Sequence, residues 1–182
     1  MIMKILFASD LGFRYFDSYV GNEYIERAFS DLLPLFKQAD FRILNFETPF
    51  ATDDLVPITK SGPSTRALPE YIYALEVMGI DAVALANNHT GDFGDEGVRF
   101  VLEHLHSGGY PAFGAGENIG EAYLPHAFEK DGERVLVLRK RVWNSRKRKA
   151  GSCGIFSRQS GEIYKERKSG RRVCGGLFPR RK

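Results

Sequence analysis

Three short aliphatic runs in the first part of the chain end at polar side chains, and helix-like segments separate the runs. The run KILFAS leads to Asp10, ILNF at 43–46 is closed by Glu47, and AVALA is followed by Asn87. Strands buried on both faces of a parallel sheet have brief, continuous apolar sequences of this kind. The alternation of such runs with helices predicts an α/β domain with a mainly parallel sheet over residues 1–138.

The segments between the runs have helical spacing and helix boundary signals. Apolar residues recur at helical spacing after Asn22, and we expect Pro34 to kink or divide that helix. A second helix is predicted from Pro69 to a stop at Gly79. Further expected elements are a helix over 96–109, short strands within 110–118 and 133–138, and a long irregular connection over 52–70.

The polar groups at the strand ends form a candidate metal site. In open α/β sheets, ligands bind beyond the carboxyl ends of the strands, so groups that follow neighbouring parallel strands meet at one edge. Asp10 and Glu47 offer carboxylates there, and the segment Asn87, Asn88 and His89 offers amides and an imidazole. This mixture suits a divalent ion such as Mn, Mg, Fe or Zn. Such an ion lowers the pKa of water and polarises a phosphoryl or acyl oxygen, which predicts a hydrolase-like site.

Each of these residues also has a purely structural explanation. Asp10 and Glu47 fit turn or helix-cap positions, the two asparagines tolerate left-handed backbone in a turn, and His89 fits a hydrogen-bonded surface histidine. Three strand ends that carry such groups together favour a shared site over turn chemistry alone. Three other histidines are predicted to lie on solvated surface: His104, His106 and His126.

The charge of the chain is divided sharply at Leu138. The net charge of +3 combines 10 basic and 21 acidic residues in 1–138 with 16 basic and 2 acidic residues in 139–182, or −11 and +14. The second segment lacks periodicity and has too little apolar content to bury a core, so a disordered basic tail is predicted. No apolar run is long enough to cross a bilayer and no signal-peptide pattern occurs, so the expected location is the cytoplasm.

Several motifs resemble the CapA family of capsule and poly-γ-glutamate synthesis proteins. The NNHxxD[FY]G motif, present as NNHTGDFG, is the most specific, and the N[LF]ETP motif, present as NFETP, is the second. CapA-like domains are similar to calcineurin-like metallophosphoesterases. The resemblance therefore implies part of a four-layered α/β sandwich with a metal centre. It is carried by ASDLGFR at 8–14, ADFRILNFETPF at 39–50, the segment 60–97 and GYPAFGAGENIGEAYLP at 109–125.

The resemblance also implies a role for each strand-end residue. Asp10 stands in the first acidic motif, Glu47 in the second and Asn88 in the Asn-His motif, and all three are implied metal ligands. His89 is implied to assist catalysis, which agrees with a proton that moves near neutral pH. We expect Asp92, three residues further on, to orient the imidazole and to fix its tautomer.

The predicted substrate contacts are Lys60, Ser61 and Asn87. Lys60 and Ser61 belong to the long connection and would hold an anionic group of the substrate, although a flexible polar loop is the simpler explanation of both. Asn87 directly precedes the implied metal ligand. Its alternative explanation is a turn position.

The chain departs from the family pattern in two places. Ser9 stands where a glycine usually precedes the first aspartate, but the carboxylate remains. No histidine follows Leu138, although the family continues with a motif of the Gly-His-His-Pro-His kind that completes the metal site. We therefore expect a half-built site. The segment 139–182 either contacts nucleic acid, an acidic polymer or an anionic membrane surface, or is translated out of frame, and the abrupt loss of pattern favours the frameshift.

Two classes of function remain open. The first is a CapA-like protein with a metallophosphoesterase-like, metal-dependent hydrolase site. It would act in the synthesis or processing of an anionic capsule polymer such as poly-γ-glutamate, with that polymer, a phosphoester or a peptide as substrate. The second is a truncated, non-catalytic remnant or binding module whose basic tail contacts polyanions. Stoichiometric metal after purification distinguishes the two.

Overall fold

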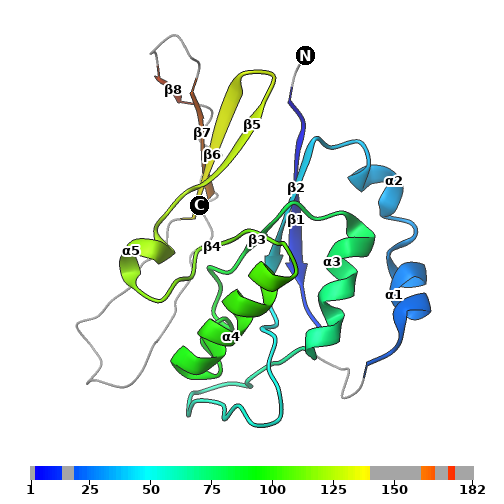
Figure 1. Cartoon of the computed structure of the whole chain (residues 1–182), viewed down its shortest axis with the longest axis vertical. Coiled ribbons are helices and arrows are strands. Elements are labelled where there is room, and N and C mark those ends of the chain that lie inside the picture. The colour runs from blue at the N-terminus through cyan, green and yellow to red at the C-terminus, as the bar shows by residue number, and fades with distance from the viewer. Residues whose placement is uncertain (1–2, 14–18, 140–160, 167–171, 175–182) are drawn as a thin grey trace, which may run out of the picture.

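The computed structural model describes residues 3–13, 19–139, 161–166 and 172–174. These residues form two sheets, with helices beside the first sheet (Figure 1). Within this part of the chain, no helix combines the length and the apolar character needed to cross a membrane.

The first sheet is parallel and carries the predicted site at one edge. Near the carboxyl ends of its strands, Asp10 is in register with Asn45, Asn45 with Ala84, and Ala84 with Phe113. This mainly parallel α/β arrangement confirms the predicted fold class and is consistent with a partial metallophosphoesterase-like domain. The strands, in their order across the sheet, are β1 (Ile5–Leu11), β2 (Phe41–Phe46), β3 (Ala82–Ala84) and β4 (Ala112–Phe113).

Short helices connect the parallel strands. Pro34 lies at the start of α2 and separates it from α1, because proline cannot continue a helix from within. Gly79 ends α3 in the left-handed conformation at φ 61°. Both boundaries confirm the sequence prediction. The helices are α1 (Asn22–Phe29), α2 (Leu33–Phe36), the 3-10 helix η1 (Pro69–Ile72), α3 (Tyr73–Met78), α4 (Gly94–Ser107) and α5 (Ile119–Ala122).

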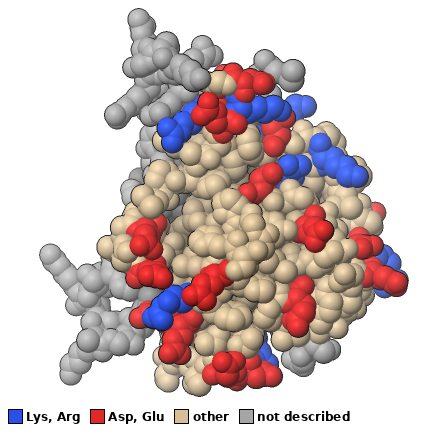
Figure 2. Space-filling view, in the orientation of Figure 1, with Lys and Arg blue, Asp and Glu red and all other residues tan. Residues whose placement is uncertain are grey.

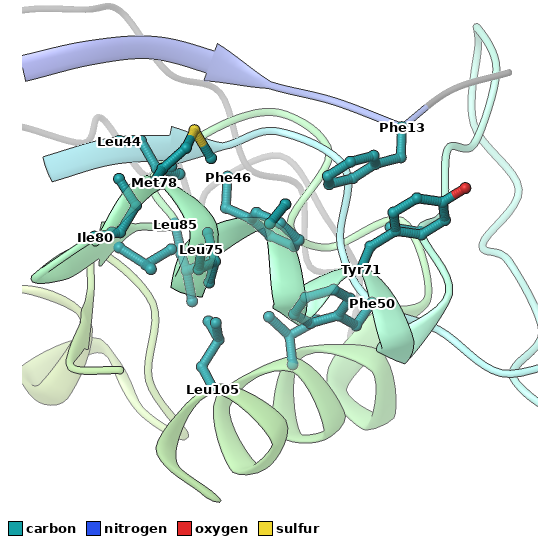
Figure 3. Close-up of a cluster of buried hydrophobic side chains, with 14 of the residues drawn as sticks. Phe13, Leu44, Phe46, Phe50, Tyr71, Leu75, Met78, Ile80, Leu85 and Leu105 are labelled. Atoms are coloured by element: carbon teal, nitrogen blue, oxygen red, sulfur yellow. The ribbon is translucent and has the colours of Figure 1, made fainter. Parts of the chain in front are cut away.

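The larger apolar core lies between the parallel sheet and the helices α1, α3 and α4 (Figure 3). Val83 of β3, Leu75 of α3 and Leu105 of α4 belong to this cluster, and each is 0% exposed. Burial of such side chains is the main favourable contribution to folding. The helix-covered face therefore provides most of the apolar burial of the described residues.

Four aromatic rings extend this core toward the carboxyl edge of the sheet. Phe13 stacks on Tyr71 with ring centroids 4.3 Å apart, and Phe46 packs on Phe50 at 4.5 Å (Figure 3). Phe46 is 0% exposed and is followed directly by Glu47. The aromatic cluster thus anchors the backbone that carries one of the candidate site residues.

A second, antiparallel sheet covers the opposite face of the parallel sheet. Strands β5 (His126–Lys130) and β6 (Glu133–Arg139) form a hairpin, which β7 (Gly161–Glu166) and β8 (Arg172–Cys174) extend. A smaller apolar cluster lies between the hairpin and the parallel sheet. Its buried members are Ile43, Ala82, Ala84, Phe113, Phe128, Val135 and Val137.

The second sheet is the part of the fold that the sequence pattern described least well. The run 133–138 forms a strand, as predicted, but this strand pairs antiparallel in the second sheet. The helix α5 was not predicted, because a segment of four residues is too short to show a helical period. The strand β5 was not predicted either. β7 and β8 lie in the basic tail, where no periodicity was found. The rest of the tail lies outside the described residues.

Strand β5 runs antiparallel to the strands of the first sheet. At one end, Lys130 donates to the carboxylate of Asp40, just before β2, and this bond holds the pKa of Asp40 below its ordinary value. At the other end, the ring of His126 stacks on Phe113, the last residue of β4, at 5.6 Å. Strand β6 therefore returns toward the edge that carries the candidate site.

Acidic side chains are distributed widely over the face of the molecule shown in Figure 2. Lys and Arg on this face gather mainly toward the end that bears the tip of the β5–β6 hairpin. This distribution agrees with the net charge of −11 that residues 1–138 carry.

Candidate functional site

Asn45 connects the ends of β1 and β3 at the predicted site. Its Nδ2 donates to Asp10 Oδ1 over 2.6 Å, and Nδ2 of Asn87 lies 3.4 Å from Asn45 Oδ1. Asn45 is buried, so these bonds replace the water that its amide loses. Asn45 was not among the predicted site residues. The available signal was a polar side chain that interrupts an otherwise apolar run.

Asn87 shapes the turn that carries Asn88 and His89. Its Oδ1 accepts hydrogen bonds from the backbone N–H groups of His89 at 2.9 Å and Thr90 at 3.0 Å. Its Nδ2 donates to the carbonyl oxygen of Phe46 over 2.8 Å, which ties the end of β3 to the end of β2. These bonds give Asn87 a structural role. Its contact with a substrate stays a prediction.

His89 is buried, and each of its ring nitrogens faces a carboxylate. Nδ1 lies 2.9 Å from Asp92 Oδ2, and Nε2 lies 4.0 Å from Glu47 Oε1. Because an ionised carboxylate only accepts hydrogen bonds, the short contact assigns a proton to Nδ1. In the neutral form of the imidazole the lone pair is then on Nε2. The expected contact between Asp92 and His89 is confirmed. The catalytic roles of the two residues stay predictions.

The long connection after β2 is bound to Asp92. Lys60 pairs with Oδ1 of this carboxylate, and the backbone N–H of Thr65 donates to Oδ2 over 2.8 Å. The N–H of Ile58 donates to the carbonyl oxygen of Asp92, also over 2.8 Å. Thr65 and Ile58 could not be found from their side chains, because both act through the backbone. Ser61, next to Lys60, is exposed, and the substrate contacts of Lys60 and Ser61 stay predictions.

The predicted metal ligands lie on the solvent side of the same edge. Asp10 and Asn88 are exposed, and the side chain of Glu47 is 25% exposed. Gly12 lies beside Glu47, since a Cβ atom at Gly12 would be 3.5 Å from Glu47 Oε2 and 3.0 Å from Thr48 Oγ1. A glycine therefore lets the backbone after β1 approach this carboxylate closely.

The donor types at this edge suit a hard divalent ion. Carboxylate and amide oxygens are preferred ligands of Mg and Mn. Among the described residues, however, no group of three or more His, Cys, Asp and Glu side chains is arranged to hold a metal ion. Asp10, Glu47 and Asn88 thus fit a metal in chemistry, and their joint coordination stays a prediction.

Two of the remaining histidines are packed against aromatic rings, which corrects the expectation of solvated surface. Nε2 of His104 lies 3.0 Å from the carbonyl oxygen of Pro69. The ring of His104 meets the ring of Phe50 edge-on, with the ring centroids 4.9 Å apart. His126 stacks on Phe113 and meets Phe128 edge-on, and burial lowers the pKa of His126. Phe50 and Phe113 come from segments distant in sequence, so local spacing did not reveal these two contacts.

A family model matches most of the chain. The family is described as bacterial capsule synthesis protein PGA_cap, and the match covers residues 9–169. It includes every strand-end residue of the candidate site. It also continues past Leu138 into the basic tail.

Three curated relatives have similar sequences over part of their length. The chain is 30% identical over 120 residues to the capsule biosynthesis protein CapA of Bacillus anthracis, with 65% of this chain and 28% of the relative covered. It is 30% identical over 131 residues to the uncharacterized protein y4uA of Sinorhizobium fredii, with the same shares. The uncharacterized protein y4sH of that organism is 31% identical over 114 residues, with 60% and 25% covered. The chain thus spans less than a third of each relative.

Proposed function

We propose, on the premise that this chain belongs to the PGA_cap family of bacterial capsule synthesis proteins, that it acts in the synthesis or processing of an anionic capsule polymer such as poly-γ-glutamate. The relative named CapA supports this proposal. Because the chain spans 28% of that relative, the activity of the whole protein is itself part of the proposal.

One observation carries the chemical part of the proposal, namely the buried pair of His89 and Asp92 beside the carboxylate of Glu47. Asp92 holds Nδ1–H of His89, so Nε2 can accept a proton from a nucleophile or, once protonated, donate it to a leaving oxygen. A positioned histidine of this kind typically contributes about 10²–10⁴-fold to a rate. We infer a hydrolase-like reaction on a phosphoester or an acyl group.

Asp10, Glu47 and Asn88 are the residues that would hold a divalent ion of Mn, Mg, Fe or Zn. Such an ion supplies Lewis-acid polarisation of a phosphoryl or acyl oxygen. The protein contributes the geometry: the bond from Asn45 orients the carboxylate of Asp10, and the turn built by Asn87 presents Asn88 to solvent.

The substrate would approach from the exposed side of this edge. Ser61 is exposed and can donate to an anionic oxygen, whereas Lys60 already pairs with Asp92 and Asn87 is bound to backbone groups. We therefore expect Ser61 to be the most accessible of the three predicted substrate contacts.

Metal analysis combined with phosphodiesterase and peptide-hydrolysis assays tests this function. Glu47→Gln keeps the shape of the side chain but removes an anionic oxygen, so metal affinity should fall by about 10-fold or more. His89→Asn should leave metal affinity unchanged and lower turnover by about 10²-fold or more. Glu103→Gln, on the exposed face of α4, is the matched control and should change neither quantity. A wild-type chain that neither binds metal nor hydrolyses either substrate would contradict the proposal.

A binding module without catalysis is the second candidate, and the charge of the tail favours it. Residues 139–182 carry +14, which attracts polyanions and makes the affinity depend on salt. Binding of poly-γ-glutamate that weakens steeply with salt, in the absence of hydrolysis, would support this candidate.

A further inference from the structure

We propose that Lys60 is a positioning residue, which acts on His89 through the carboxylate of Asp92. It would not bind an anionic group of the substrate directly. This inference deepens the proposed function, because it takes His89 as the side chain that transfers protons. The observations that carry it concern one buried carboxylate and the two chain segments that meet on it.

Asp92 is the point where these two segments join. It is 1% exposed, and its carboxylate accepts three contacts: Lys60 on Oδ1, and the N–H of Thr65 and Nδ1–H of His89 on Oδ2. Two of the three come from the long connection, and one comes from His89 in the turn that Asn87 shapes. The position of the imidazole and the position of the connection therefore depend on the same side chain.

Lys60 is the cation that compensates the charge of Asp92. A buried carboxylate without a cation is costly, and neutral donors alone offset only part of that cost. The backbone N–H of Thr65 is neutral, whereas the side chain of Lys60, at 17% exposure, is largely withdrawn from solvent beside Asp92. The ammonium group is thus committed to an internal partner.

The surroundings of Thr65 indicate that the bond to the Asp92 carboxylate fixes the position of this part of the connection. The residue is 6% exposed, and among the described atoms its hydroxyl oxygen has no hydrogen-bond partner. A buried hydroxyl without a partner is unfavourable. The structure tolerates it at a residue whose backbone N–H binds Asp92, and the nearby N–H of Ile58 adds a bond to the backbone of Asp92.

Loss of Lys60 should loosen both segments at once. Without a partner on Oδ1, the carboxylate can rotate about its last side-chain bond, which disturbs the two bonds that share Oδ2. The ring of His89 would then lose its fixed orientation, and the connection would detach more often. A direct contact between Lys60 and substrate predicts neither change in the free protein.

The test uses the full 182-residue chain labelled with ¹⁵N, in the absence of substrate and metal. We compare Lys60→Met, Lys60→Arg, Asp92→Asn and the double variant Lys60→Met with Asp92→Asn. The measured quantities are the ¹⁵N shifts of the two ring nitrogens of His89 and the hydrogen-exchange rates of the Thr65 and Ile58 amides. Arg66→Met is the matched control, because Arg66 lies on the same connection and pairs with Asp53, which is 89% exposed.

Lys60→Met should shift the ring nitrogens of His89 and speed exchange of the Thr65 and Ile58 amides by about tenfold or more. Lys60→Arg should restore most of both signals, since the positive charge returns. In the Asp92→Asn background, Lys60→Met should add almost nothing, because a residue that acts through Asp92 has no effect once the carboxylate is gone. Arg66→Met should leave both signals unchanged. Unchanged exchange at the Leu105 amide in the core verifies that each variant remains folded.

Two results would overturn the proposal. One is a Lys60→Met variant with the wild-type His89 spectrum and amide exchange. The other is a double variant in which Lys60→Met adds as large a change to Asp92→Asn as it causes in the wild-type chain. A wild-type chain that shows the expected coupling but no metal-dependent hydrolysis would refute the proposed function and leave the positioning role of Lys60 intact.

Discussion

Two buried regions of this molecule meet at the carboxyl edge of the parallel sheet, and different forces hold them. The core under the helices consists of apolar side chains such as Leu75 and Phe46, which are stabilised by area and close packing (Figure 3). The polar edge contains Asn45, Asn87 and Asp92, which are almost as deeply buried but are stabilised by specific hydrogen-bond partners. The loss of stability caused by a substitution in the core should therefore scale with the side-chain volume removed. The loss of stability caused by a substitution at the polar edge should depend on which hydrogen-bond partner is lost.

The largest expected effect belongs to the core. Leu75→Ala removes a fully buried side chain and leaves a cavity, so we expect the free energy of unfolding to fall by about 2–5 kcal/mol. Leu35→Ala is the control, because Leu35 is 52% exposed, and it should change stability by no more than about 0.5 kcal/mol. Urea unfolding measures both. Equal losses in the two variants would show that the cluster under the helices is not the main source of stability.

A smaller effect is expected within the polar edge, where two adjacent asparagines should behave differently. Asn87→Ala leaves two backbone N–H groups and the carbonyl oxygen of Phe46 without their partner, so unfolding free energy should fall by about 1–3 kcal/mol. Asn88→Ala alters an exposed side chain and should cost no more than about 0.5 kcal/mol. The same unfolding assay distinguishes them. A larger loss of stability from Asn88→Ala than from Asn87→Ala would mean that the turn depends on Asn88 and would contradict this prediction.

The smallest expected effect concerns Thr65, whose buried hydroxyl oxygen has no hydrogen-bond partner among the described residues. Thr65→Val removes this hydroxyl and retains both the shape of the side chain and the backbone N–H that binds Asp92. We expect stability to stay within about 1 kcal/mol of wild type, with a gain as the expected sign. Thermal unfolding at several pH values measures this. A clear loss of stability would reveal a partner for the hydroxyl in solution.

The sequence by itself determined the elements whose signals are local. Continuous apolar runs typical of buried strands predicted β1, β2 and β3. Pro34 and Gly79 marked helix boundaries that the structure confirms. The polar residues that follow those strands predicted one shared edge. The fixed geometry of parallel strands converts sequence position into spatial proximity, so this inference needed no knowledge of distant contacts.

Tertiary structure alone decided which partners those residues have. Lys60 meets Asp92 across 32 residues, and Asn45 bridges Asp10 and Asn87. The placement of β5 and β6 on the opposite face of the sheet was decided in the same way. Residue types and local spacing indicate that a charge needs a partner but do not identify it, because the partner depends on how separate segments pack. That is why Lys60 was predicted to contact substrate, while the structure pairs its charge with a buried carboxylate.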